Sequence, residues 1–191
     1  MHRFVCVAAL LGLTLLLNAC TTVVNATTSE PIEPNPGKRT LGTKLDDGRL
    51  ERIATVNLNK VDDRLAESPI SVHSYNGVLL LVGQVPNKEL RELAGETANK
   101  IPRVRQVHNE LEVEAPISFL ARTNDNWLGT KIKTKLLANR DIAGGRVRVI
   151  LENNTAYLMG LVSRTEGKEI TNVARHTRGV QKVVRVFDYI D

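Results

Sequence analysis

The fold is decided by residues 70–83, ISVHSYNGVLLLVG, in which two apolar runs flank Asn76-Gly77. Asn and Gly accept the positive φ angles of a two-residue type I′ turn, so this pair predicts a β-hairpin. The pattern returns 77 residues later in 147–160, VRVILENNTAYLMG, with Asn153-Asn154 at the turn. Because Asn also tolerates positive φ, a second hairpin is expected there. The sequence therefore predicts a duplicated fold.

A helix is expected after each hairpin, and a strand after each of these helices. Asn87 can cap the first helix, and Ser163 with Glu166 forms a capping-box pattern for the second. The closing strands are expected at 104–113, VRQVHNELEV, and at 180–189, VQKVVRVFDY. These two strands differ in sequence but keep the same spacing of apolar residues, which supports the duplication.

A further helix precedes each hairpin, near 47–60 and near 125–138, with apolar residues at helical spacing. Each half is thus an α+β unit of the order α-β-β-α-β, whose two helices can cover one face of a three-stranded mixed sheet. The expected divisions are a leader over 1–19, a tether over 20–45, a first domain over 46–115, a linker over 116–124 and a second domain over 125–191.

The amino terminus has the features of a lipoprotein leader. A short basic start is followed by an apolar stretch over 4–17, which is too short to span a membrane comfortably. Residues 17–20, LNAC, resemble a bacterial lipobox, which predicts that Cys20 becomes the acylated first residue. An ordinary secretory peptide with a chance cysteine is the alternative. The other cysteine, Cys6, falls in the leader, so no disulfide is expected.

Residues 27–37, TTSEPIEPNPG, contain three prolines and no apolar period, which is typical of a flexible tether. Thr21-Thr22 follows the cysteine where an Asp would favour retention at the inner membrane. By similarity to the sorting rules of Gram-negative lipoproteins, we expect an outer-membrane location.

Four segments carry a resemblance to a known family: LGTKLDDG at 41–48, VLLLVGQ at 78–84, NDNW at 124–127 and MGLV at 159–162. With the glycine that ends the second strand of each half, they resemble the BON domain of bacterial envelope proteins. Two such domains behind a lipobox resemble the dual-BON outer-membrane lipoproteins of the DolP (YraP) family. The resemblance implies a non-enzymatic role in outer-membrane integrity, with phospholipid contact by the second domain.

The sequence contains no arrangement typical of catalysis. His73 and His108 lie outside any metal-ligand spacing, and surface positions in strands are expected for both. Gly83 and Gly160 are interpreted as places that need backbone freedom. Asp46-Asp47 is interpreted as the cap of the first helix. We therefore expect no enzyme activity, no cofactor and no metal site.

The formal net charge of +5 is unevenly divided between the two halves. Residues 46–115 contain nine Lys/Arg and twelve Asp/Glu, a net charge of −3, whereas 125–191 contain twelve and seven, a net charge of +5. The second domain is therefore expected to face an anionic surface, and the first is not. Random drift of surface charge after duplication is the alternative.

Trp127 is the single tryptophan of the chain. When the first helices of the two halves are aligned, its counterpart is Arg49, and a position that accepts Arg is not typical of a core. At about 100° per residue, Leu128, Ile132 and Leu136 form the expected buried stripe, and Trp127 points roughly 140° away from its centre. Packing of Trp127 against the first domain is the alternative.

An exposed Trp beside Lys residues is typical of a helix that binds an anionic membrane interface. The predicted function is therefore an outer-membrane-anchored lipoprotein, facing the periplasm, whose second domain binds anionic phospholipid. The alternative is an adaptor that binds outer-membrane assembly proteins or division-linked cell-wall factors, and a nucleic-acid partner is disfavoured by the leader. The predicted lipid-binding residues are Trp127, Thr130, Lys131, Lys135 and Leu137.

Overall fold

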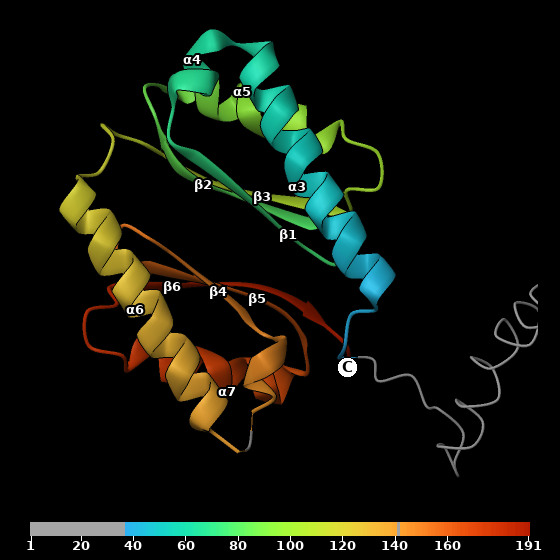
Figure 1. Ribbon diagram of the computed structural model, residues 1–191, viewed down its shortest axis with the longest axis vertical. Helices are drawn as coiled ribbons and strands as arrows, with labels where there is room; N and C mark the ends of the chain where they lie inside the picture. Colours follow the sequence, from blue (N-terminus) through green and yellow to red (C-terminus); the bar gives the residue numbers. More distant parts are fainter. Residues whose placement is uncertain (1–36, 141) are drawn as a thin grey trace, which may run out of the picture. The chain divides into compact units, whose positions relative to one another are not determined.

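The computed structural model describes residues 37–140 and 142–191, and the leader and most of the tether lie outside them. The described residues form two α-β-β-α-β repeats (Figure 1). The first contains α3 (Leu41–Val61), α4 (Asp63–Glu67), β1 (Ile70–Tyr75), β2 (Val78–Val85), α5 (Lys88–Asn99) and β3 (Gln106–Val113). The second contains α6 (Phe119–Ala138), the 3-10 turn η1 (Gly144–Arg146), β4 (Arg148–Glu152), β5 (Thr155–Val162), α7 (Arg164–Arg175) and β6 (Lys182–Tyr189). The predicted fold class is confirmed.

Each repeat has a three-stranded mixed sheet with the second strand at its centre. That strand pairs antiparallel with the first strand and parallel with the third. Both predicted hairpin turns are present, since Asn76 and Gly77 have φ angles of 54° and 76°, and Asn153 and Asn154 have 47° and 60°. These values are typical of the left-handed region that a type I′ turn requires.

The first helix of each repeat begins earlier than predicted. α3 starts at Leu41 because the Thr40 side chain accepts a hydrogen bond from the Thr43 amide, and α6 starts at Phe119 because Ser118 caps it in the same way. The helices therefore include residues 41–45, which we assigned to the tether, and 119–124, which we assigned to the linker. A cap nearly two turns upstream of the predicted start satisfies amides that would otherwise have no partner.

Asp47 does not cap a helix, which corrects our interpretation of Asp46-Asp47. It lies in the second turn of α3, is 3% exposed, and accepts hydrogen bonds from the amides of Asn76 and Gly77. Asp125 of α6 binds the amides of the second hairpin turn in the same way. Each repeat thus uses a helix carboxylate to bind its own hairpin turn.

The helix that follows each hairpin, α5 or α7, has the cap that the sequence predicts. Asn87 accepts a hydrogen bond from the Leu90 amide, and Ser163 and Glu166 form the reciprocal capping box. Gly83 has a φ of 125°, and a Cβ there would lie 2.0 Å from the carbonyl oxygen of Pro69. Gly160 has no left-handed φ, so our explanation holds for Gly83 alone.

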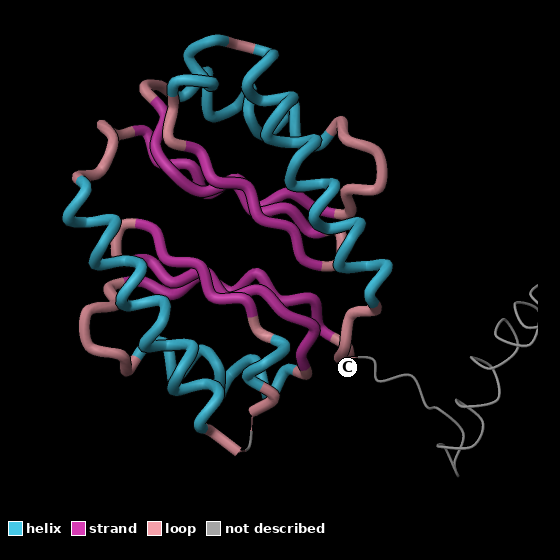
Figure 2. Tube along the Cα trace, viewed as in Figure 1, coloured by secondary structure: helices cyan, strands magenta, loops and turns pink. Residues whose placement is uncertain are grey.

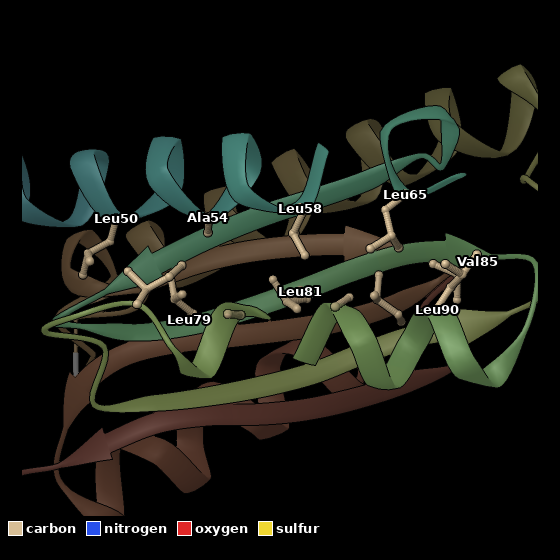
Figure 3. Packing of buried hydrophobic residues seen from close by; sticks show 12 residues of the cluster. Leu50, Ala54, Leu58, Leu65, Leu79, Leu81, Val85 and Leu90 are labelled. Carbon is tan, nitrogen blue, oxygen red and sulfur yellow. The ribbon is translucent and has the colours of Figure 1, made fainter. Parts of the chain in front are cut away.

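Each repeat has its own hydrophobic core between its helices and one face of its sheet. In the first, Leu50, Ala54 and Leu58 of α3 face Leu79 and Leu81 of β2 (Figure 3). The second repeat has the equivalent core, listed here by its fully buried members: Ile132, Leu136, Ala156, Leu158, Ile170 and Ala174.

A third core lies between the two sheets, whose other faces pack against each other (Figures 1 and 2). Every residue of β2 and of β5 is buried as a result, which explains why both central strands are nearly continuous apolar runs, with Gln84 and Thr155 as their polar residues. Helices therefore cover only the two outer faces. We call this shared region the sheet–sheet core; it comprises Tyr75, Val78, Leu80, Val82, Tyr157, Met159, Leu161 and Val186.

Polar contacts between the repeats surround the sheet–sheet core. Arg148 of β4 donates to the Glu51 carboxylate of α3 at 2.5 Å and to Nδ1 of His73 at 3.0 Å. Arg105 donates to Asp188 at 2.5 Å. The two ion pairs, Arg148 with Glu51 and Arg105 with Asp188, join oppositely charged groups of the two repeats, so the repeats are complementary in charge at these points.

The histidines correct our expectation of surface positions. His73 is partly buried, and the pKa of its imidazole is lowered to about 4, first by burial and then by the charge of Arg148. Since a guanidinium only donates, Nδ1 of His73 must accept, which requires a neutral ring. His108 is also partly buried, and burial lowers its pKa.

Candidate functional site

The buried side of α6 is the one that the sequence predicts. Leu128, Ile132 and Leu136 are at most 1% exposed. This stripe fixes the rotation of the helix, because three residues at this spacing define one face. The opposite face of α6 therefore points to solvent.

That solvent-facing side contains four large apolar side chains. Phe119 is 80% exposed, Leu120 is 78% exposed, and Trp127 and Leu137 are each 60% exposed. At about 100° per residue, all four lie within an arc of roughly 100°. The prediction that Trp127 points outward is confirmed, and the alternative that it packs against the first repeat is wrong. We call these four residues the α6 apolar face.

Three further predicted residues of α6 have different roles. The Lys131 ammonium lies 4.7 Å from the centroid of the indole ring, a cation–π distance that brings charge and apolar surface together. Lys135 instead donates to the hydroxyl of Thr177 at 3.1 Å, which turns its ammonium toward the loop after α7. The hydroxyl of Thr130 bonds within the helix to the carbonyl of Asn126.

Phe119 and Leu120 belong to this face, but the sequence analysis missed them. They were assigned to the linker because α6 was expected to begin near residue 125. The signal that could have found them is Ser118, which stands in the same relation to Phe119 as Thr40 does to Leu41. Recognition of that repeated cap would have extended both helices by the missing turns.

The charge on α6 is one-sided. Its single acidic residue, Asp125, is 3% exposed and already binds the second hairpin turn. Its four basic residues are Arg122, Lys131, Lys133 and Lys135. Burial lowers the pKa of Lys133, whose ammonium donates to the carbonyls of Gly144 and Val147, so this lysine serves the fold. No accessible carboxylate lies on α6 to repel an anionic surface.

The described ranges, 37–140 and 142–191, contain neither a metal-binding cluster nor a membrane-spanning helix. Within them, no three His, Cys, Asp or Glu side chains gather closely enough to hold a metal ion. None of the helices there combines the length and the apolar run that a membrane crossing requires. Cys20 lies outside these ranges. The α6 apolar face is therefore the main candidate site.

Comparison with known proteins bears directly on the two repeats. The BON domain profile matches residues 46–115 and 124–191. The chain is 35% identical to the outer membrane lipoprotein DolP of Haemophilus influenzae over 184 residues, which are 96% of this chain and 95% of that protein. The chain belongs to the dual BON-domain DolP family. The repeats are hereafter the first and second BON domains.

Two other similarities were found. The 21 kDa hemolysin of Actinobacillus pleuropneumoniae is 36% identical over 162 residues, which cover 85% of this chain and 81% of that protein. Among solved structures, the C-terminal domain of CdsD from the type III secretion system of Chlamydia trachomatis has a TM-score of 0.30 and 14% identity. That match covers 76% of this chain and 67% of the other. Membership of the DolP family identifies the chain as an outer-membrane lipoprotein of the BON type.

We predict that Cys20 is the acylated anchor, so its replacement by Ser, whose hydroxyl cannot form the thioether to the lipid, should leave an unprocessed or mislocalised protein. A stable membrane hold requires more than one acyl chain, so a protein without lipid on residue 20 should no longer fractionate normally with the outer membrane. Immunoblots of separated membrane fractions would measure this. The matched control is Cys6→Ser, which alters the leader alone and should fractionate normally. Normal fractionation of Cys20→Ser would exclude Cys20 as the anchor.

Proposed function

We propose that the second BON domain binds anionic phospholipid through the α6 apolar face, on the periplasmic side of the outer membrane. The acylated Cys20 attaches the protein, and α6 adds selectivity for the lipid headgroup. This lipid contact is the means by which the protein supports the integrity of the envelope.

The observation that carries the proposal is the α6 apolar face itself. A Phe, a Trp and two Leu that are 60–80% exposed on one side of one helix are costly in water. Such side chains are favourable at the boundary between headgroups and acyl chains, and Trp is enriched there. Lys131 beside the indole supplies the positive charge that an anionic headgroup requires.

Replacement of Trp127 by Glu should abolish binding to vesicles that contain anionic lipid. The change removes the largest apolar side chain of the face and adds a charge of the same sign as the headgroups. Residues 36–191 form one compact unit, so this unit can be used for co-sedimentation with vesicles. Binding by the unaltered unit should weaken with salt and vanish in vesicles of phosphatidylcholine alone.

Two controls separate lipid contact from folding. Trp127→Glu should leave the melting temperature nearly unchanged, whereas Ile132→Glu should unfold the domain because it places a charge in the core. Asn172→Glu adds the same charge at an exposed position of α7 and should bind lipid normally. If Trp127→Glu lowers the melting temperature as Ile132→Glu does, Trp127 is a packing residue. Binding to a protein in neutral vesicles would favour the adaptor function instead.

A further inference from the structure

Helix α3 of the first BON domain also has a solvent-facing side with an unusual composition. Its buried side consists of Asp47, Leu50, Ala54 and Leu58. At about 100° per residue, the opposite arc of roughly 120° contains four aliphatic and three basic side chains. We call this the α3 outer face; it comprises Leu41, Leu45, Arg49, Arg52, Ile53, Val56 and Lys60.

Two aliphatic members of the α3 outer face are as accessible as the apolar residues of α6, and the other two are less accessible. Leu41 is 79% exposed and Leu45 is 72% exposed, while Val56 and Ile53 are 43% and 41% exposed. The most exposed residues lie in the first two turns of the helix. Aliphatic side chains grouped on one helix face in this way mark a contact surface.

The basic residues of this face have no acidic neighbours that neutralise them. Arg49, Arg52 and Lys60 make no ion pair within the described residues. Of the three carboxylates on α3, Asp47 is buried in the hairpin turn and Glu51 pairs with Arg148. The third, Asp46, lies outside the arc, 3.7 Å from Arg103. The outer face therefore has a charge of +3, although the whole first domain is negative.

This distribution corrects the argument that we drew from the net charge of the first domain. Five of its twelve acidic residues lie on α5 and β3, on other parts of the domain. A membrane touches one face of a protein, and charges beyond about 8–10 Å of solvent are screened at physiological salt. The local charge of α3, and not the sum over the domain, determines which surface it attracts.

Helix α3 follows the tether directly, and this position indicates that the surface it contacts is the membrane leaflet of the anchor. Arg39 fastens the end of the tether to the folded unit, since it pairs with Asp47 at 2.5 Å and stacks on the ring of Tyr75 at 3.5 Å. Leu41 follows directly. About 20 residues of chain separate the proposed anchor at Cys20 from this point, and a chain of that length has an average span of roughly 25 Å. The first turns of α3 therefore lie within reach of the leaflet that holds the anchor.

We propose that α3 is a second membrane-binding helix, which lays Leu41 and Leu45 into an anionic leaflet while Arg49, Arg52 and Lys60 contact the headgroups. This goes beyond the function proposed above, which assigns lipid to α6 alone, and it does not depend on α6. Duplication of the BON domain would then have supplied two lipid-binding helices of different strength, one with Trp and one with aliphatic residues only.

The test uses the full-length acylated protein in vesicles of phosphatidylglycerol and phosphatidylcholine with brominated acyl chains, which quench Trp fluorescence only on contact. Because Trp127 is the single Trp, the unaltered protein reports on α6. The variant Leu45→Trp with Trp127→Tyr reports on α3, and Leu45 is exposed enough that the change should not disturb folding. The matched control, Glu92→Trp with Trp127→Tyr, places the probe at an exposed position of α5.

Emission from residue 45 should shift to the blue and be quenched in anionic vesicles, while emission from residue 92 should not. Reversal of Arg49 and Arg52 to Glu should remove most of the quenching, whereas reversal of Lys88 on α5 and of Lys100 at its C-cap should not. A water-exposed spectrum at residue 45 would overturn the inference, as would equal quenching in neutral vesicles. A blue shift seen only in native envelopes would indicate a protein partner and would overturn it too.

The two proposals fail separately in this assay. Quenching of Trp127 without quenching at residue 45 leaves the proposed function intact and removes α3. Quenching at residue 45 without quenching of Trp127 leaves α3 as a membrane-binding helix and removes the function proposed for α6.

Discussion

Replacement of Leu80 by Ala should lower the free energy of unfolding by about 2–5 kcal/mol, the usual cost of such a truncation in a close-packed core. Leu80 is fully buried and belongs to the sheet–sheet core, on the side of β2 that faces the second BON domain. If this face of β2 were exposed to solvent, the same truncation would lower the free energy of unfolding far less. Urea denaturation followed by circular dichroism would measure the change.

Leu81 is the matched control for Leu80. It is the next residue of the same strand, is also fully buried, and points to the opposite side, toward α3 and α5. Leu81→Ala should be destabilising whether or not the two sheets meet. Comparable losses in the two variants support the sheet–sheet core. A loss below about 1 kcal/mol for Leu80→Ala, beside a full loss for Leu81→Ala, would show that the domains do not pack this way in solution.

Replacement of Asp47 by Ala should be similarly destabilising, by about 3 kcal/mol or more. It leaves the amides of Asn76 and Gly77 and the hydroxyl of Ser74 without their acceptor, and it leaves Arg39 without its carboxylate. Each buried polar group that loses its partner costs roughly 1–3 kcal/mol. Thermal melting would measure the loss, and Asp46→Ala, at the exposed neighbouring position, should change little.

The contribution of Asp47 should depend on pH in a defined direction. Burial by itself would raise the pKa of this carboxyl, but the hydrogen bonds from Gly77, Asn76, Ser74 and Arg39 outweigh burial and hold the pKa below its usual 3.8. A lowered pKa in the folded state means that this stability is fully present above the unfolded-state value near 3.8. It is lost as pH falls through the lower folded-state value. The Ala variant should therefore lose less stability than the parent protein between pH 5 and pH 2. Equal losses would contradict this assignment.

Much of the fold follows from local signals in the chain. The turn residues Asn76-Gly77 and Asn153-Asn154 predict both hairpins, because few residues accept positive φ. The caps at Asn87 and Ser163 predict where the second helices begin. The exposure of Trp127 was also predictable, since duplication places Arg49 at the equivalent position. Each of these inferences rests on residues close together in sequence or on comparison of the two repeats.

The roles of Asp47 and His73 were missed because they depend on contacts between distant segments. Asp47 resembles a helix cap in sequence, and only the approach of the first hairpin turn, about 30 residues away, makes it an acceptor for that turn. From its polar side chain, His73 is expected at the surface. It is partly buried only because the second domain packs there, where Arg148 donates to its Nδ1. In each case the partner is chosen by packing, which no local pattern encodes.

The sequence by itself determined the duplication, the order of the main elements in each domain and the outward direction of Trp127 and Leu137 on α6. It did so because hairpin turns, caps and helical spacing depend on neighbouring residues. Only the tertiary structure decided that the two sheets pack together, since an apolar strand face is compatible with any apolar partner. The tertiary structure alone also decided which charges of the first domain remain accessible. Asp47 and Glu51 make hydrogen bonds and ion pairs within the folded protein, whereas Arg49 and Arg52 are exposed.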